Sequence, residues 1–292
     1  MFLLRQQPRF DLFTASIPDK YFFIVLSMVV TGMVTVIKWD KILPSRQDYV
    51  NLSPLPLALR TMLLANSAAI LIAVALFALA VNAASILLFP LVVTAGETSF
   101  QVFFEFAGVH ALCVLLASLF TFSSIFLLMG SAMTVLPLRL FWPFSRWLRG
   151  LVIAMLLAVL LTSFAGKAIV AGYERYPSSW LSLLPPVWFV SLYQGLQHRG
   201  NPALVAAAEL GLHVTALSVL LAVLVYPLCY RKAFFYVEET ESGRAKAVVW
   251  VALLRYVNDR WNANSHFEQA CYPFVMRVLV RNDAMRSSSE SS

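Results

Sequence analysis

Long apolar runs separated by short polar stretches dominate the pattern of this 292-residue chain. A helix needs about 20 mainly apolar residues to cross the hydrocarbon core of a bilayer. The third apolar run is too long for an upright helix, so we expect it to tilt or to begin with an interfacial turn. The pattern predicts an all-α, polytopic transmembrane bundle of about five spans, at residues 21–37, 65–93, 102–136, 148–172 and 203–230.

Composition supports this class. Hydrophobic residues make up 60% of the chain and charged residues 13%, and the mean hydropathy is +0.76. Soluble domains average about 45–50% apolar and about 25% charged residues, so this chain has too few charges to cover a water-facing surface. The net charge is +7, but the basic residues lie between the apolar runs rather than along one stripe. They are typical of cations that flank membrane spans, and nucleic acid is not an expected partner.

The basic residues also predict an orientation, because cytoplasmic loops are enriched in Lys and Arg. The links 95–101 and 173–202 hold few basic residues and are expected outside. Three other regions are expected in the cytoplasm, together with the C-terminus, and their basic residues are Lys38, Lys41, Arg46 and Arg60, then Arg139, Arg146 and Arg149, then Arg231 and Lys232.

The N-terminal segment, residues 1–20, does not fit this orientation. Five spans and a cytoplasmic C-terminus place it outside, yet it carries Arg5, Arg9 and Lys20. Either the charge rule is weak here or a preceding helix is missing from the chain.

Residues 231–292 differ in composition and are expected to form a short helical cytoplasmic tail. Polar residues from Glu238 to Arg244 predict a solvated turn, and residues 245–254 are apolar but too short to span, which favours an amphipathic helix. The Ser-rich end is expected to be disordered.

Catalytic and phosphate-binding motifs are absent from the sequence. It has no GxxxxGK[ST], HExxH or GxSxG string, so we expect neither ATP hydrolysis by this chain nor a cofactor or metal. Cys113, Cys229 and Cys271 are far apart and are expected to act as small buried hydrophobes. We therefore predict that the chain is not itself an enzyme.

Ionisable residues within the predicted spans are few, and such residues are usually functional. Glu209 and His213 share one helix face at i,i+4 spacing. This possible intramembrane polar pair could hold a proton or a metal ion, although one Glu–His pair is too small a ligand set for a specific metal site. The alternative is a hydrogen-bonded pair near the interface. Glu105, His110 and Lys167 are the other candidates.

Two connecting segments have distinctive sequences. In residues 38–64, prolines at 44, 54 and 56 forbid one continuous helix, and the segment, called the elbow below, is either a headgroup anchor or a docking surface for a cytoplasmic partner. In residues 173–202, aromatic residues are expected at a membrane interface. They form either an aromatic belt with a re-entrant turn or a possible external gate at Pro185, Pro186, Trp188 and Phe189.

The strings W-D…P-S-R-Q-D-Y…L-S-P-L-P…R-T in the elbow and L-P-P-V-W-F…L-Y-Q in the external link resemble bacterial ABC transporter permease subunits of the type-2 exporter class. The resemblance covers residues 17–230 and implies that residues 21–230 form a transmembrane permease-like domain in the bacterial inner membrane. It implies a separate ABC ATPase subunit, a second permease copy or half, and membrane lipids as partners. It also implies that Asp48, Leu55, Pro56 and Arg60 contact the ATPase, and that the chain is a partial or shortened permease.

Two other functions remain open. A membrane-embedded lipid-processing enzyme would require Glu105 and His110 to converge with Glu209 and His213 within hydrogen-bond reach. A non-catalytic membrane scaffold or assembly subunit would need no such site.

Overall fold

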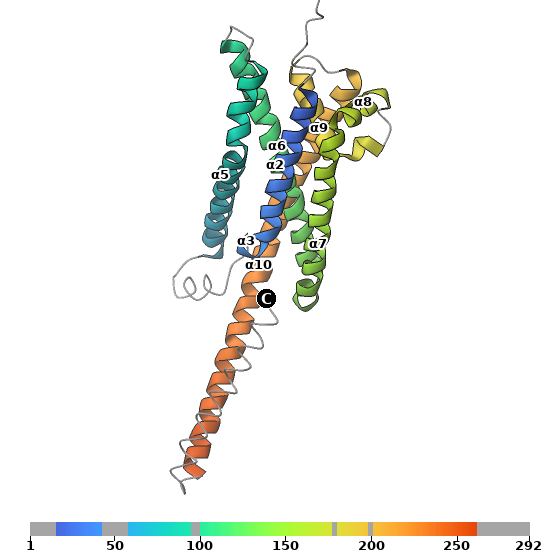
Figure 1. The fold of residues 1–292 in the computed structure, drawn as a ribbon. Coiled ribbons are helices and arrows are strands. Elements are labelled where there is room, and N and C mark those ends of the chain that lie inside the picture. Colours follow the sequence, from blue (N-terminus) through green and yellow to red (C-terminus); the bar gives the residue numbers. More distant parts are fainter. Residues whose placement is uncertain (1–15, 43–57, 95–99, 177–179, 198–200, 262–292) are drawn as a thin grey trace, which may run out of the picture.

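A computed structural model describes residues 16–42, 58–94, 100–176, 180–197 and 201–261. The described residues form helices and no strands, as the apolar pattern predicts (Figure 1). The elements are α2 (Ile17–Ile37), α3 (Trp39–Ile42), α5 (Leu59–Val93), α6 (Phe100–Val135), α7 (Leu138–Thr162), η2 (Ser163–Ala165), α8 (Gly166–Arg175), η3 (Trp180–Leu183), α9 (Pro185–Leu196) and α10 (Pro202–Trp261).

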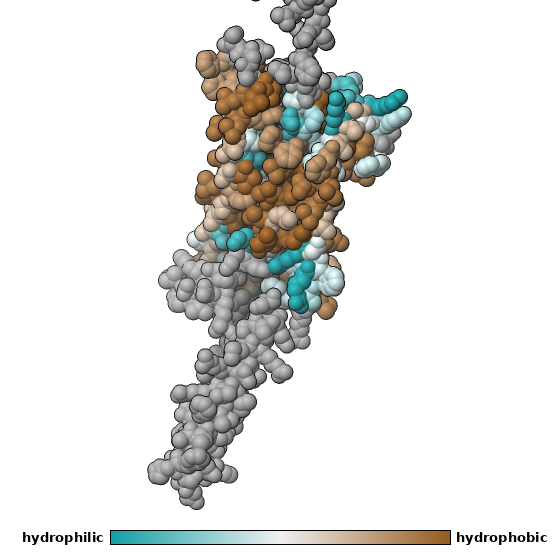
Figure 2. Space-filling model, in the orientation of Figure 1, coloured by the Kyte–Doolittle hydropathy of each residue, from teal (hydrophilic) through white to brown (hydrophobic). Residues whose placement is uncertain are grey.

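Five of these regions are long and apolar enough to cross a membrane, and each overlaps one of the five predicted spans. Figure 2 shows a broad hydrophobic band across the middle of the molecule, with hydrophilic residues gathered toward its two ends. The prediction of an all-α, multi-pass membrane protein is therefore confirmed.

Helices α2 and α6 form the centre of the bundle. Helix α2 packs against α5, α6, α7 and α9, and α6 also packs against α10. Helix α5 stands at the edge (Figure 1), and its apolar side chains, such as Leu71 and Val92, are mostly exposed. A helix that is hydrophobic all round and little covered by protein is suited to contact with lipid.

Hydrogen bonds between helices replace the hydrophobic force that lipid does not supply. Ser118 on α6 connects three helices, because its hydroxyl lies 2.6 Å from that of Ser27, 3.2 Å from that of Thr31 and 3.3 Å from the amide nitrogen of Asn82. All four side chains are buried. Their polar atoms hold α2, α5 and α6 in register at the middle of the bundle.

The fourth span, Leu140–Arg175, is not one continuous helix. Helix α7 stops at Thr162, the 3₁₀ turn η2 follows, and α8 turns away from the axis of α7 (Figure 1). The turn forms where Gly166 lies against Tyr21, since a Cβ on Gly166 would come within 2.9 Å of the Tyr21 ring. Hydropathy alone does not detect such a break, because residues on both sides of it are apolar.

The turn predicted between Glu238 and Arg244 is wrong, because α10 continues through it as helix to Trp261. Polar composition indicated exposure to water, but Glu, Arg and Lys are also strong helix formers, and one glycine is tolerated. Helix α10 therefore runs well past the other helices (Figure 1).

Candidate functional site

The elbow lies mostly outside the described residues, and Asp48, Leu55 and Pro56 are among those not described. Arg60 is exposed in the first turn of α5. At this end of the bundle, called the elbow end below, the side-chain amide of Asn66 donates to the backbone oxygen of Ile42 at 3.3 Å and to the hydroxyl of Tyr226 at 2.6 Å. Asn66 on α5 thus connects α3, at the start of the elbow, to α10.

The predicted polar pair on α10 does not face the bundle. Glu209 and His213 are both exposed, and Nδ1 of His213 lies 2.7 Å from the backbone oxygen of Glu209. Among the described residues, no three His, Cys, Asp or Glu side chains gather closely enough to hold a metal ion.

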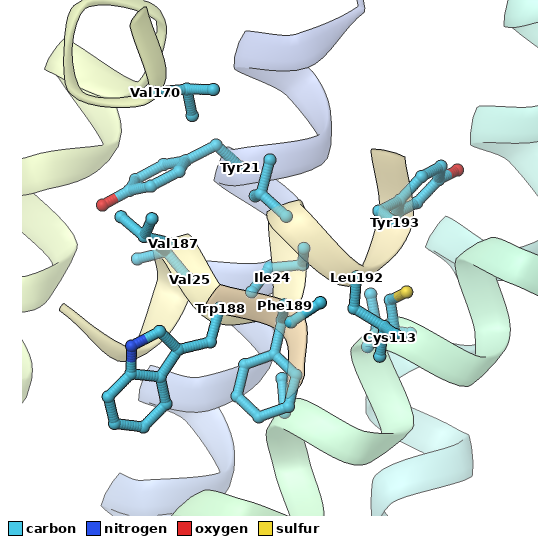
Figure 3. Packing of buried hydrophobic residues seen from close by; sticks show 14 of the residues in the cluster. Tyr21, Ile24, Val25, Cys113, Val170, Val187, Trp188, Phe189, Leu192 and Tyr193 are labelled. Atoms are coloured by element: carbon cyan, nitrogen blue, oxygen red, sulfur yellow. The ribbon is translucent and has the colours of Figure 1, made fainter. Parts of the chain in front are cut away.

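The residues of the predicted gate lie on α9, which is a helix buried in the bundle rather than a loop. Pro185 and Pro186 occupy its first turn, where proline is well tolerated. Trp188 and Phe189 belong to the main hydrophobic core (Figure 3), and the indole nitrogen of Trp188 donates to the backbone oxygen of Ser182 at 2.7 Å.

Helix α9 packs closely against α10 at Gly211. A Cβ at this glycine would lie 2.6 Å from Cβ of Trp188. The absence of a side chain therefore allows the two helices to approach.

The least expected polar group is Lys20, in the first turn of α2. Its side chain is 0% exposed. Its Nζ atom donates to Oε1 of Gln197 at 2.8 Å and lies 4.7 Å from the ring centroid of Tyr193 and 5.5 Å from that of Phe106. We call Phe106, Tyr193 and Gln197 the ammonium cage, since two aromatic rings and one amide oxygen lie close to the cation.

His110 and Tyr193 extend this polar cluster. Both side chains are fully buried. Within the described residues, the two ring nitrogens of His110 and the hydroxyl oxygen of Tyr193 have no hydrogen-bond partner. Their rings are 5.8 Å apart, and His110 also contacts the rings of Phe23 and Phe89. Figure 3 shows Tyr193 and Cys113 on one side of the core, away from Tyr21 and Trp188. Burial raises the pKa of the Tyr193 hydroxyl above its ordinary value of 10, so this group stays neutral.

The Glu–His convergence required for a lipid-processing enzyme does not form. His110 is fully buried, whereas Glu105, Glu209 and His213 are exposed. Lys167 is exposed on α8. The alternative enzyme function therefore lacks the cluster on which it depended.

Sequence reasoning missed Lys20 as a site residue and counted it among the N-terminal loop cations. A signal was present: Lys20, Ser27, Thr31 and Thr35 recur at helical spacing along one face of α2, and all four are buried. A cation that heads a polar stripe on the buried face of a span is placed to point inward. Lys20 therefore does not count as a loop charge. The expected external N-terminal segment then carries one basic residue fewer, which reduces its conflict with the rule that basic loops lie in the cytoplasm.

Comparisons with family models, with curated proteins and with solved structures give no match. The fold itself defines the class, an all-α multi-pass membrane protein. Its most distinctive site is the buried ammonium cage at the end of the bundle formed by α8 and α9, called the α9 end below.

Proposed function

We propose that this chain is a membrane permease subunit of an ABC transporter in the bacterial inner membrane. In this proposal the chain lines the translocation path, together with a second permease copy or half, and a separate ATPase subunit binds the elbow. The C-terminus lies in the cytoplasm. The five apolar spans and the residue strings in the elbow and in α9 support the proposal.

The observation that carries the proposal is the contact of Asn66 with both Ile42 and Tyr226. A permease must transmit a movement of its ATPase from the elbow to the helices that line the path. Asn66 joins α3, α5 and α10, so a displacement of the elbow acts directly on α10. Because α10 packs along α9, the displacement continues toward the α9 end. Packed helices of this kind switch between discrete arrangements rather than deforming continuously.

The test is co-purification with the ABC ATPase encoded nearest to this chain. The tagged chain and the ATPase are expressed together and extracted in mild detergent. Arg60→Glu and the double variant Leu55→Asp/Pro56→Asp are compared with Arg175→Glu. Arg175 is also exposed, but it lies on α8 at the opposite end of the bundle. It is therefore a control with the same change of charge.

We expect the ATPase to be retained by the native chain and by the Arg175 variant and lost from the elbow variants. Size-exclusion profiles check that every variant remains folded. If the ATPase co-purifies with none of these proteins, not even with a folded native chain, the permease function is overturned. A scaffold or assembly subunit is then the better explanation. Equal loss from the Arg60 and Arg175 variants would show that binding follows total charge rather than the elbow.

A further inference from the structure

The ammonium of Lys20 is a fully buried charged group inside a membrane bundle. Taking a charged side chain to membrane depth is costly, more so at the centre of a span than near its end. An apolar side chain of similar length would fill the same space without that cost. Charged groups inside membrane proteins are accordingly associated with substrate and ion pathways.

The surroundings of Lys20 have the chemistry that recognises organic ammonium groups. Aromatic faces within about 6 Å of a cation attract it through the ring quadrupole, and this attraction grows when water is excluded. The Tyr193 and Phe106 rings lie within that range, and Oε1 of Gln197 accepts a hydrogen bond from the ammonium. A primary amine from another molecule would find the same contacts.

The cage is also assembled from separate elements. Lys20 lies on α2, Phe106 on α6, and Tyr193 and Gln197 at the end of α9. Lys20 belongs to the first turn of its helix, so a small movement of the start of α2 would withdraw it. Lys20 is therefore placed as a ligand that is part of the chain, rather than as a residue that lines the site.

We propose that Phe106, Tyr193 and Gln197 form a binding site for the primary ammonium group of a lipophilic amine, which Lys20 occupies as an internal ligand when no amine is bound. The surroundings of the cage are apolar, because His110 beside Tyr193 is packed against the rings of Phe23 and Phe89. That the amine is transported rests on the proposed permease function, but its binding does not.

The experiment removes the internal ligand and offers a substitute. Lys20→Ala deletes the outer part of the side chain, and n-propylammonium contains the same heavy atoms as the deleted part. The purified variant is heated in detergent, without any ATPase, in the presence of n-propylammonium, propan-1-ol or propionate. Lys20→Met, which fills the space with an uncharged chain, and Lys20→Ala/Tyr193→Leu, which removes one face of the cage, are the controls.

We expect n-propylammonium to raise the Tm of Lys20→Ala by several degrees in a concentration-dependent manner, because a ligand that binds only the folded state stabilises it. Propan-1-ol and propionate should not do so, and neither control variant should respond. If Lys20→Ala aggregates, its monodisperse yield after extraction with each compound replaces the Tm, with the same expected order.

Three outcomes would overturn the inference. Absence of any response to n-propylammonium would show that the cage does not bind amines. An equal response to propan-1-ol would show that the vacated space is only apolar. A response to propionate alone would assign the site to anions. None of these results bears on whether the elbow binds an ATPase, so the two proposals fail separately.

Discussion

The Nζ atom of Lys20 donates a hydrogen bond of 2.8 Å to Oε1 of Gln197, although 177 residues separate them in the chain. The bond joins the start of α2 to the end of α9 at the α9 end of the bundle. It also fixes the cation over the Tyr193 ring. This contact is a side-chain hydrogen bond between two elements that lie far apart in the sequence.

We predict that Lys20 and Gln197 are energetically coupled. Gln197→Leu removes the amide oxygen from a buried ammonium, and we expect the free energy of unfolding to fall by about 1.5–3 kcal/mol, the range for hydrogen bonds to charged groups. The double variant Lys20→Met/Gln197→Leu should lose less than the sum of the single changes, with a coupling energy of at least about 1 kcal/mol. Equilibrium unfolding in mixed micelles measures all four proteins.

The control for this cycle is Lys38→Met combined with Gln197→Leu. Lys38 is exposed at the opposite end of α2, about 27 Å from Lys20 at 1.5 Å per residue. Its effect should add to that of Gln197→Leu within about 0.5 kcal/mol. Equal coupling in both pairs would contradict the direct contact.

Gly211 provides a prediction on the packing of α9. Gly211→Ala would place a methyl group 2.6 Å from Cβ of Trp188, an atom that cannot rotate away. We expect overpacking to lower the free energy of unfolding by about 1–3 kcal/mol. Thermal unfolding in detergent and the emission of Trp188 in a variant without the other tryptophans would report the shift of α9.

Gly108→Ala is the matched control, because no atom lies within 4 Å of the added Cβ. Alanine has a higher helix propensity than glycine, so this change should be neutral or stabilising by up to about 1 kcal/mol. If both variants behave alike, the close approach of α9 and α10 is incorrect.

Ser118 gives a prediction on the centre of the bundle. Ser118→Ala removes the oxygen that Ser27, Thr31 and Asn82 share. Hydrogen bonds between membrane helices contribute about 0.6 kcal/mol each on average, so we expect a loss of about 1–2 kcal/mol. Unfolding in mixed micelles measures it.

Ser131→Ala changes the same residue type on the same helix. Ser131 is half-buried, and among the contacts described its hydroxyl donates only to the Leu128 oxygen of its own α6 turn. Its replacement should change the free energy of unfolding by less than about 0.5 kcal/mol. A loss as large as that of Ser118→Ala would contradict the role of the shared serine.

The sequence by itself determined the class and the spans of this protein. Runs such as residues 203–230 contain enough apolar residues to cross a bilayer whatever their neighbours are, and a helix satisfies its own backbone hydrogen bonds there. These properties depend only on local composition. The predicted spans therefore overlap the five long helical regions, although the fourth region begins at Leu140 rather than at residue 148 and is interrupted at η2.

Only the tertiary structure decided which polar side chains face inward. Glu209 and His213 form a convincing pair by spacing but are exposed, whereas Lys20 resembles a flanking cation and is fully buried. Likewise, Pro186, Trp188 and Phe189 belong to a buried helix rather than to a loop. The orientation of a helix about its axis is set by packing against residues far away in the chain, such as Gln197 for Lys20, and spacing along one helix does not contain that information.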